Sequence, residues 1–480
     1  MSIKKFRMQY LKKKRMQYKK IHFVGIKGVG MTPLAIIAKE AGFKVSGSDI
    51  HEDFITKDAL ERAKIEPFSK FDKENIKTCD LVVVSAAHGG FENNEALEAK
   101  KQNIPVMSQA EALGLFQTGK ILNKNFEGIC VAGSHGKTTT TAMIATILKE
   151  ALLDPSYSVG TGDIPSLGSP GHLGKGKFFV CEADEYISFN SPKFLFLSPK
   201  IAVVTNIDFD HPDVYSSIEQ IEEAFLKFAN KLPEEGILIA CGDGETNSKF
   251  LNKYLGRKIT FGFSKSNDYF IEKVNFSGGK TFFWVKHKDT NLGEFSIDIF
   301  GEQNALDGLA AVIASLEAGL PLDKIKKGLA AYRGSKRRSE YIGKTKYGAQ
   351  LYDDYAHHPL EISKTLDAFR KNFPKEKIIP IFQPHMYSRT KLLFDDFVKA
   401  FDKCDFLIMT EIFPSFREER DESFSSEILA KEINKRRGNT AFIKNLYDVV
   451  KYLDESKFGE DTVLITMGAG DIYKIDKELV

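Results

Sequence analysis

From residue 19 onward, short apolar runs alternate with stretches of helical spacing. Strands buried in a parallel sheet are typically continuous apolar runs, whereas amphipathic helices are longer and repeat every three to four residues. On these criteria we predict helices at 33–41, 142–148 and 309–318, and strands at 21–24, 44–49, 81–85, 129–131, 178–181, 201–204, 378–382, 406–409 and 463–467. The alternation predicts an α/β fold with parallel sheets.

Two regions depart from this alternation. Phe, Thr and Gly alternate with polar residues across 257–300, so antiparallel strands are expected there. Phe394, Phe397 and Phe401 are spaced as on one face of a helix, and we expect them in a core.

The strongest local motif is residues 132–141, A-G-S-H-G-K-T-T-T-T, between a predicted strand and a predicted helix. In a phosphate-binding loop, glycines let backbone N–H groups surround phosphate oxygens, and the helix N-terminus adds partial positive charge. Here Lys137 would add a full charge and Thr138 a hydroxyl for Mg²⁺. The spacing departs from G-x-x-x-x-G-K-[ST], because Val131 occupies the first glycine position. The alternative is an ordinary glycine turn before a helix.

A second glycine-rich turn follows the first predicted strand. Residues 25–31 read G-I-K-G-V-G-M, and Asp49 ends the next strand, near the distance expected for a ribose-binding acid. The pattern is G-x-x-G-x-G rather than G-x-G-x-x-G, so alone it favours either a dinucleotide oxidoreductase or a tight strand–helix turn.

Polar clusters follow two strands of the middle region, at 182–185 and 205–211. Ligands of open α/β sheets gather at the carboxyl ends of strands, so both clusters should face the phosphate loop. Carboxylates there would suit Mg²⁺. The alternatives are solvated turns after the strands and a turn at the His-Pro pair.

The last third of the chain carries D-D-Y-A-H-H-P at 353–359 and Q-P-H-M-Y-S-R-T at 383–390. Adjacent histidines could suggest zinc, but no third ligand has suitable spacing. Substrate-binding or surface histidines are favoured.

Breaks in the pattern divide the chain into three units. It becomes polar at 118–125, and another unit begins after Arg337 and Arg338. We predict a Rossmann-like N-terminal domain at 20–120, a P-loop central ATPase domain at 121–331 and a Rossmann-like C-terminal domain at 332–480, after a basic extension at 1–19.

Composition narrows the class of protein. Hydrophobic residues make up 42% of the 480 and charged residues 28%, which fits a soluble globular protein. Five scattered cysteines without a C-x-x-C favour reduced thiols in a cytoplasm. No apolar run reaches membrane-spanning length, and the start lacks the apolar region of a secretory signal. We therefore expect a cytoplasmic protein without a membrane partner.

Charge is unevenly distributed. Nine basic residues and no acid lie in 1–20, whereas the whole chain carries +3, which leaves −6 for the remainder. The extension could bind nucleic acid or an acidic membrane, although a solvated arm is favoured. A mildly acidic body argues against nucleic-acid binding.

Together these motifs resemble those of the Mur ligases, the ATP-dependent amide-forming enzymes of peptidoglycan synthesis. The resemblance covers nearly the whole chain from residue 20. It rests on six segments in the same order, at 28–31, 133–138, 182–185, 205–211, 353–359 and 382–385. It is greatest for the branch that joins L-alanine to the lactyl carboxylate of UDP-N-acetylmuramate through an acyl phosphate.

The resemblance implies UDP-, ATP- and amino-acid-binding domains, with ATP and Mg²⁺ required. The matching UDP-substrate positions are Gly28, Gly30, Met31, Thr32, Asp49 and Ser85. The matching ATP positions are Gly133, Ser134, His135, Gly136, Lys137, Thr138, Thr139, Asn304, Arg338 and Asp354. Thr138 and Glu182 would hold one Mg²⁺ and His211 a second Mg²⁺, and the amino-acid contacts would be Tyr355, His357, His385 and Arg389.

The implied chemistry explains the catalytic assignments. Phosphorylating a carboxylate brings two anions together, so Lys137, Arg338 and the metal held by His211 would offset the repulsion. Water must be excluded from an acyl phosphate, so closure of the third domain is expected. The sequence assigns no base for the amine and no oligomeric state.

Several positions depart from the family pattern. Met386 stands where an arginine that helps bind the amino-acid carboxylate is usual, which leaves the added amino acid open. Gln303 precedes Asn304 where a histidine is usual, and Asp307 replaces a second asparagine. Ser339 stands where an aromatic or leucine is common. Phe225 matches the position of a carbamylated lysine found in other branches.

Other functions stay open from sequence alone. The nearest is a murein-peptide recycling ligase, which joins a whole peptide to the same acceptor. A nucleotide-binding oxidoreductase would rest on residues 25–31, and a nucleic-acid-binding ATPase on the basic extension.

Overall fold

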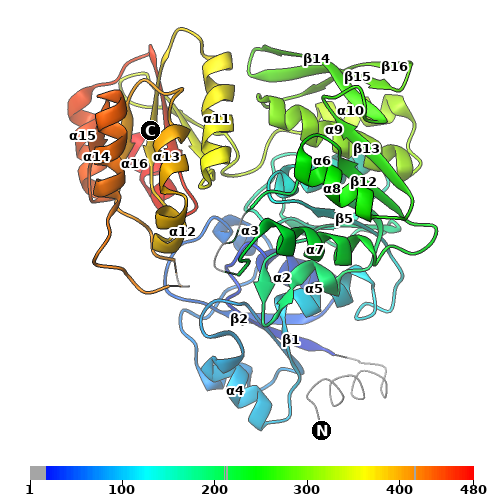
Figure 1. The fold of residues 1–480 in the computed structure, drawn as a ribbon. Helices are drawn as coiled ribbons and strands as arrows, with labels where there is room; N and C mark the ends of the chain where they lie inside the picture. The colour runs from blue at the N-terminus through cyan, green and yellow to red at the C-terminus, as the bar shows by residue number, and fades with distance from the viewer. Residues whose placement is uncertain (1–17, 210, 212–213, 416–417) are drawn as a thin grey trace.

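The computed structural model describes residues 18–209, 211, 214–415 and 418–480, so the predicted extension lies almost wholly outside the described residues. The described chain forms three α/β units, each around its own sheet, as the alternation of apolar runs predicts (Figure 1). In this view the N-terminal unit lies below the central unit, and the C-terminal unit stands beside the central one.

The N-terminal unit has a four-stranded parallel sheet in the order β2-β1-β3-β4. Its strands are β1 Lys20–Val24, β2 Lys44–Ser48, β3 Leu81–Val84 and β4 Val106–Ser108. Its helices are α2 Thr32–Glu40, α3 Lys57–Arg62, α4 Asn94–Lys101 and α5 Gln109–Gln117, with 3-10 turns η1 Lys73–Ile76 and η2 Gly90–Glu92. The glycine-rich turn joins β1 to α2, as predicted.

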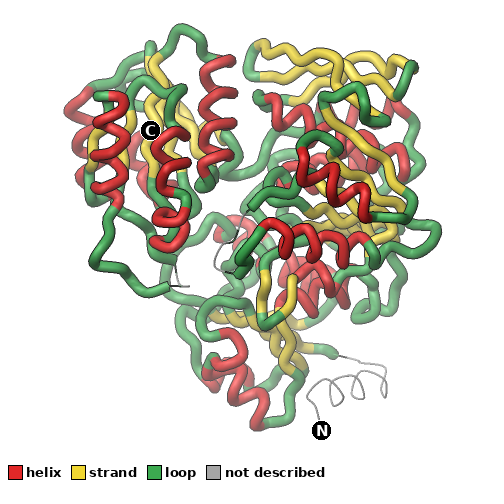
Figure 2. The backbone as a smooth tube through the Cα atoms, in the orientation of Figure 1, coloured by secondary structure: helices red, strands yellow, loops and turns green. Residues whose placement is uncertain are grey.

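The central unit has a ten-stranded sheet in the order β16-β15-β14-β13-β12-β11-β5-β8-β6-β7. The strands are β5 Glu127–Ala132, β6 Ser156–Ser158, β7 Gly171–His172, β8 Phe178–Glu182, β11 Pro199–Val204, β12 Ile237–Cys241, β13 Lys258–Gly262, β14 Tyr269–Ser277, β15 Lys280–His287 and β16 Thr290–Ile297. Helices on both faces are α6 Lys137–Glu150, α7 Ile218–Ala229, α8 Glu245–Lys253, α9 Glu302–Glu317 and α10 Leu322–Ala330 (Figure 2). A hairpin of β9 Ile187–Ser188 and β10 Ser191–Pro192 precedes η3 Lys193–Phe196.

The expectation of antiparallel strands across 257–300 is correct only in part. β14, β15 and β16 pair antiparallel, but β13 pairs parallel with both β12 and β14. β13 follows the crossover helix α8, and a helical crossover returns the chain in the same direction.

The C-terminal unit has a six-stranded sheet in the order β17-β18-β22-β19-β20-β21, parallel except for β17. The strands are β17 Glu340–Lys344, β18 Gln350–Asp354, β19 Lys377–Phe382, β20 Leu407–Met409, β21 Thr440–Phe442 and β22 Thr462–Met467. The helices are α11 Pro359–Asn372, α12 Tyr387–Leu392, α13 Phe394–Ala400, α14 Ser426–Arg437, α15 Leu446–Ser456 and α16 Asp476–Leu479, with η4 Ile472–Ile475. Of the three phenylalanines predicted in a core, Phe397 and Phe401 are fully buried and Phe394 is half-buried.

The units differ in how they are joined. One apolar cluster runs from α5 of the N-terminal unit, through Phe116, to Phe194 and Phe225 of the central unit. The C-terminal unit has its own cluster, to which Phe300 is the central unit's only buried contributor among the described residues. Burial of apolar area is the main source of cohesion, so the first two units are packed as one body and the third is attached more weakly.

The described helices include none that is both long enough and apolar enough to cross a membrane.

Candidate functional site

The phosphate-loop motif adopts the predicted strand–turn–helix arrangement. β5 ends at Ala132 and α6 begins at Lys137, with Gly133 and Gly136 at φ +142° and +81°. A Cβ at Gly133 would lie 1.9 Å from Thr205 Oγ1, and one at Gly136 would lie 2.3 Å from Asp307 Oδ1. Only glycine fits both positions, because the backbone conformation and the space exclude a side chain.

Lys137 folds back over its own loop. Its Nζ donates to the carbonyl oxygens of Gly133 and, at 3.1 Å, of Ser134, and it forms a 2.9 Å ion pair with Glu185. The charge therefore lies at the mouth of the loop, where a phosphate could exchange for the carboxylate.

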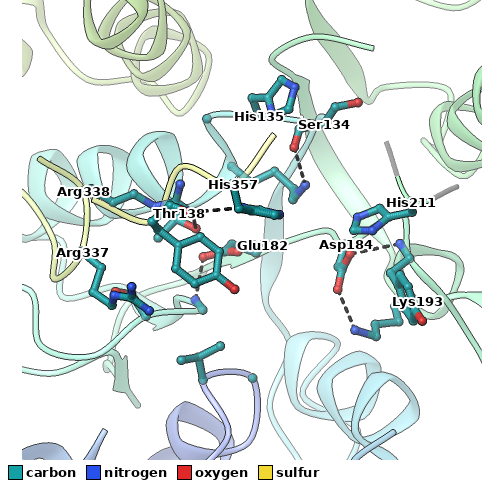
Figure 3. A pocket seen from close by; sticks show the side chains of 18 of the residues that line it. Ser134, His135, Thr138, Glu182, Asp184, Lys193, His211, Arg337, Arg338 and His357 are labelled. Atoms are coloured by element: carbon teal, nitrogen blue, oxygen red, sulfur yellow. Dashed lines mark hydrogen bonds and ion pairs between the residues drawn. The ribbon is translucent and has the colours of Figure 1, made fainter. Parts of the chain in front are cut away.

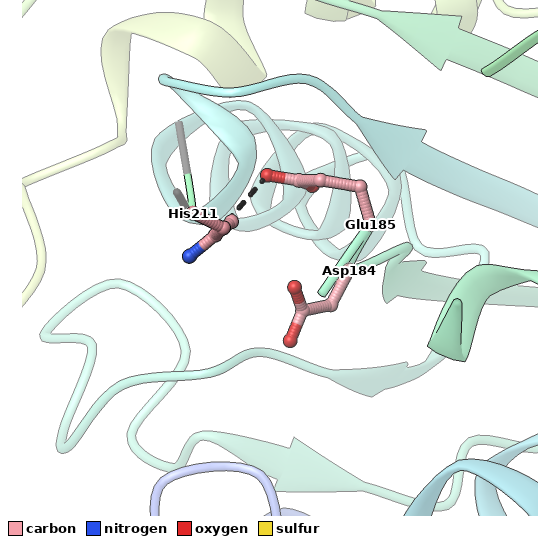
Figure 4. A group of neighbouring side chains, drawn as sticks. All are labelled: Asp184, Glu185 and His211. Carbon is pink, nitrogen blue, oxygen red and sulfur yellow. Dashed lines mark ion pairs between the residues drawn. The ribbon is translucent and has the colours of Figure 1, made fainter. Parts of the chain in front are cut away.

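Asp184, Glu185 and His211 form a carboxylate–histidine cluster (Figure 4). The cluster lies beside Lys137, because Glu185 pairs with that lysine. One ligand atom from each of Asp184, Glu185 and His211 lies within 4.8 Å of the others. Glu185 is almost fully buried, and its Oε2 has no hydrogen-bond partner among the described groups. A buried carboxylate oxygen without a donor is costly, and a divalent cation would satisfy it. The donor set therefore fits Mg²⁺.

Asp184 is ionised in this cluster. Burial alone would raise the pKa of its carboxyl, but Lys193, Lys137 and His211 outweigh burial and lower that pKa. Lys193 Nζ lies 2.7 Å from Asp184 Oδ2.

The ligands expected for two Mg²⁺ ions lie in two places, with Thr138 and Glu182 apart from His211. Glu182 Oε1 accepts a 2.6 Å hydrogen bond from Gly160 N, and burial raises the pKa of its carboxyl against the lowering effect of Lys137 and Arg338. His211 instead lies with Asp184 and Glu185. The chain turns after β8 ends at Glu182, which carries the next two acids toward His211.

A cavity of about 360 Å³ connects the three units and contains both places (Figure 3). Its lining includes Gly30 from the N-terminal unit, and the loop residues, Glu182 and His211 from the central unit. From the C-terminal unit come Arg338, Tyr355, His357, His385 and Arg389. The loop therefore faces the acidic and histidine clusters, as expected, and a third unit completes the cleft.

An adjoining cavity of about 270 Å³ lies between α9 and the C-terminal unit. Thr139, Asn304, Asp307 and Asp354 line it. Asn304 Nδ2 donates to Phe300 O at 2.7 Å, and burial raises the pKa of Asp307 to about 7. Asp354 accepts from Ser339 N at 2.7 Å and Ala356 N at 2.9 Å, so it braces the turn that presents Arg338.

The two adjacent arginines have different surroundings. Arg337 is buried, pairs with Asp353 at 3.1 Å and donates to carbonyl oxygens of the loop after β22. Arg338 reaches across the cleft to Thr138 Oγ1 at 3.4 Å and lies 5.1 Å from the Tyr355 ring centre. The structure thus gives Arg338 the cross-cleft position that the resemblance implied.

The amino-acid candidates lie together at one side of the large cavity. The rings of His357 and His385 are 5.8 Å apart, and Arg389 Nη1 lies 3.3 Å from His385 Nδ1. Arg389 is 3% exposed. Met386 is also buried, but it is not among the described residues that line the cavity.

The UDP candidates gather at the carboxyl ends of β1, β2 and β3. Their side chains mostly stabilise the turn: Asp49 Oδ2 accepts from Lys27 N at 2.8 Å, Thr32 Oγ1 donates to Ile26 O at 2.8 Å, and Ser85 Oγ donates to Ala87 O at 3.3 Å. Met31 is buried and Gly28 lies in the turn, so any ligand there would meet mainly backbone groups.

The assignments from sequence missed four residues at the cleft. Asp184 and Glu185 belong to the polar cluster at 182–185, which predicts a magnesium site in general but not these two ligands. No sequence pattern points to Lys193 or Glu361. Glu361 is notable because its Oε1 lies 2.9 Å from His135 Nδ1 of the phosphate loop.

Comparison with known proteins matches this architecture. Family models match residues 20–120 (Mur ligase family, catalytic domain), 131–315 (Mur ligase middle domain) and 337–470 (Mur ligase, glutamate ligase domain). A relative in Desulfitobacterium hafniense named UDP-N-acetylmuramate–L-alanine ligase is 40% identical over 464 residues, 96% of this chain and 99% of its own length.

The chain belongs to the Mur ligase family.

Other Mur ligases show the same likeness. A UDP-N-acetylmuramate–L-alanine ligase of Geobacter is 39% identical, over 96% of this chain and 97% of its own. The crystal structure of the UDP-N-acetylmuramate–alanine ligase of Thermotoga maritima has a TM-score of 0.80 at 27% identity, covering 96% of this chain and 98% of its own. That of a murein peptide ligase of Psychrobacter arcticus has a TM-score of 0.70 at 25% identity, with the same coverage.

These matches confirm the family and the three-part α/β fold predicted from the sequence. They displace the oxidoreductase and the nucleic-acid-binding ATPase as the class of this protein, whereas the basic extension lies before the matched residues. The predicted boundaries at residues 120 and 331 stay predictions.

Proposed function

We propose that this protein is an ATP-dependent ligase that joins L-alanine to the lactyl carboxylate of UDP-N-acetylmuramate in peptidoglycan synthesis. The relatives that carry this name align with nearly the whole chain. The observation that carries the proposal is the 360 Å³ cleft, which is lined by the phosphate loop, by Asp184 and His211 of the carboxylate–histidine cluster, and by His357, His385 and Arg389. A ligase of three substrates needs one such shared space.

Each unit has a proposed role. The turn at 25–32, with Asp49 and Ser85, binds the UDP part, and the loop at 133–139, with Asn304, Arg338 and Asp354, binds ATP. Tyr355, His357, His385 and Arg389 bind the amino acid. We place the divisions between these domains near residues 120 and 331.

Two places fit divalent cations. Thr138 and Glu182 would hold one, and Asp184, Glu185 and His211 would hold another. When bound, Mg²⁺ would supply charge neutralisation for the phosphate oxygens that these residues face.

The chemistry follows from these positions. A carboxylate oxygen of the lactyl group attacks the γ-phosphorus, and ADP leaves. Lys137 and Arg338 offset the charge on the transferred phosphoryl group. The amine then attacks the acyl carbon, and inorganic phosphate leaves with the carboxylate oxygen. Both nucleotide substrates suggest a cytoplasmic reaction.

The second candidate is a murein-peptide recycling ligase. The structural likeness to the Psychrobacter arcticus enzyme and Met386 in place of the usual arginine favour it. A whole peptide would need space beyond Arg389, whereas L-alanine would not.

Phosphate release separates the two. The purified protein would be incubated with ATP, Mg²⁺, UDP-N-acetylmuramate and one of L-alanine, L-serine, glycine or the tripeptide. We expect release with L-alanine that depends on the UDP-sugar. Release only with the tripeptide would overturn the assignment in favour of the recycling ligase.

A further inference from the structure

Glu361 lies in the first turn of α11 and faces the phosphate loop across the cleft. One carboxylate oxygen, Oε1, lies 2.9 Å from His135 Nδ1. The other, Oε2, accepts hydrogen bonds from His357 N at 3.1 Å and His358 N at 3.3 Å, and lies 3.2 Å from His357 Nδ1. A single side chain therefore contacts both the ATP side and the amino-acid side of the cleft.

This carboxylate is ionised where it lies. Burial would raise the pKa of Glu361, but two effects outweigh burial and hold that pKa well below the usual range: the positive charge of His357 and His135 when they are protonated, and the hydrogen bonds of the carboxylate with both rings. A charged acceptor binds N–H donors roughly twice as strongly as a neutral one.

The phosphate loop does not depend on Glu361 for its shape. His135 N donates to Asn206 Oδ1 at 2.9 Å, and His135 O accepts from Asn206 Nδ2 at 3.0 Å and from the Thr205 hydroxyl. These contacts lie within the central unit, so the loop backbone is fixed before the C-terminal unit closes.

The orientation of His357 does depend on Glu361. Its Nδ1 lies 3.1 Å from Tyr355 O and 3.2 Å from Glu361 Oε2. A ring nitrogen between two oxygen acceptors carries the hydrogen, so Nε2 is the basic nitrogen of the neutral ring. His357 points into the large cavity (Figure 3), which His385 and Arg389 also line.

We propose that Glu361 is a positioning residue. It connects His135 of the phosphate loop to His357 on the amino-acid side of the cleft. It holds His357 with Nε2 toward the incoming amine. The amino acid arrives as an ammonium ion and transfers one proton to Nε2. The freed nitrogen lone pair then forms the C–N bond as the acyl carbon–oxygen bond to phosphate breaks, and the departing phosphate takes the second proton that the amine nitrogen releases. This inference rests on the proposed ligase function.

The test compares Glu361→Gln with Glu361→Asp and a matched control. Glutamine keeps the size of the side chain and removes its charge, whereas aspartate keeps the charge on a shorter stem. The control is Lys371→Gln, because Lys371 lies on the same helix, pairs with Glu302 of the central unit at 2.9 Å, and itself lines neither of the two cavities. It removes an inter-unit ion pair without touching His135 or His357.

Two rates are measured for each protein. Amide formation gives kcat/KM for L-alanine, and trapping with hydroxylamine reports the acyl phosphate formed from ATP and UDP-N-acetylmuramate. For Glu361→Gln we expect kcat/KM for L-alanine to fall about 10- to 100-fold, the loss of one charge-assisted hydrogen bond. Hydroxamate formation and KM for ATP should stay within about threefold of wild type, because the loop is held by Asn206. Glu361→Asp should recover part of the loss.

The two assays distinguish failure of the inference about Glu361 from failure of the proposed ligase function. If Glu361→Gln behaves like Lys371→Gln in both assays, or if it loses hydroxamate formation as strongly as amide formation, the inference is wrong. If the wild-type protein forms no hydroxamate that depends on UDP-N-acetylmuramate, the proposed ligase function itself fails. Retained binding of UDP-N-acetylmuramate by each variant shows that it is folded.

Discussion

Arg338 Nη2 donates a hydrogen bond to Thr138 Oγ1 at 3.4 Å, although 200 residues separate the two. Thr138 is the second residue of α6, and Arg338 belongs to the turn before β17. The contact brings a fixed positive charge to the mouth of the phosphate loop only when the C-terminal unit is closed. Polar contacts of this kind, together with the packing of Phe300 into the apolar cluster of the C-terminal unit, hold the third unit in place.

Replacing Arg338 tests this relationship. We expect Arg338→Ala to lower kcat by at least about 100-fold, because a charge that stabilises phosphoryl transfer is lost. Affinity for UDP-N-acetylmuramate, measured by calorimetry, should not change. Arg333→Ala removes an exposed arginine paired with Asp298 and serves as the control. Equal activity in the two variants would contradict the role of Arg338.

Replacing Lys137 tests whether ATP and UDP-N-acetylmuramate bind at separate sites. Lys137→Ala should abolish detectable turnover, because it removes the phosphate-binding charge of the loop. Binding of UDP-N-acetylmuramate should survive, since the turn at 25–32 lies in another unit. A simultaneous loss of UDP-sugar affinity would show that the two sites are not separate.

The carboxylate–histidine cluster predicts a change in metal dependence. Glu185→Gln should raise the Mg²⁺ concentration needed for half-maximal activity by about tenfold or more, because a buried anionic oxygen ligand becomes neutral. Glu235→Gln, at an exposed position, is the control. An unchanged Mg²⁺ titration would place the metal elsewhere.

Asp307 predicts a pH dependence of stability. Burial raises the pKa of this carboxyl from 3.8 to about 7, so the folded protein keeps its proton where the unfolded chain has lost it. A raised pKa gives a contribution to stability that is complete below pH 3.8 and is lost as pH rises to about 7.

Asp307→Asn does not titrate. Between pH 4 and 7, the free energy of unfolding of the native protein should therefore fall relative to that of the variant by roughly 1–4 kcal/mol, and stay level above pH 7. Denaturant titrations without nucleotide would measure this, with exposed Asp289→Asn as control. Parallel curves for all three proteins at every pH would refute the prediction.

The sequence predicts the local features of the site well. The loop ending at Lys137 and the strand ending at Glu182 follow from apolar runs and glycines, since neighbouring residues determine them. The order of the six motif segments also indicated the family, and the family resemblance in turn implied that Arg338 reaches across the cleft.

What the sequence does not predict depends on distant contacts. Glu361 meets His135 across 226 positions, which no periodicity reveals. Asp184 and Glu185 follow Glu182 after a single alanine, and only the turn after β8 brings these two acids to His211. Met386 stands at a position expected to contact substrate, but its side chain packs into the core.

The central claim is that ATP activates the lactyl carboxylate for attack by L-alanine in the shared cleft. UDP-N-acetylmuramate carrying ¹⁸O in that carboxylate tests it most directly, with mass spectrometry of the inorganic phosphate released. We predict one ¹⁸O atom in the phosphate for each amide bond formed with L-alanine. Unlabelled phosphate accompanying amide formation would contradict the account.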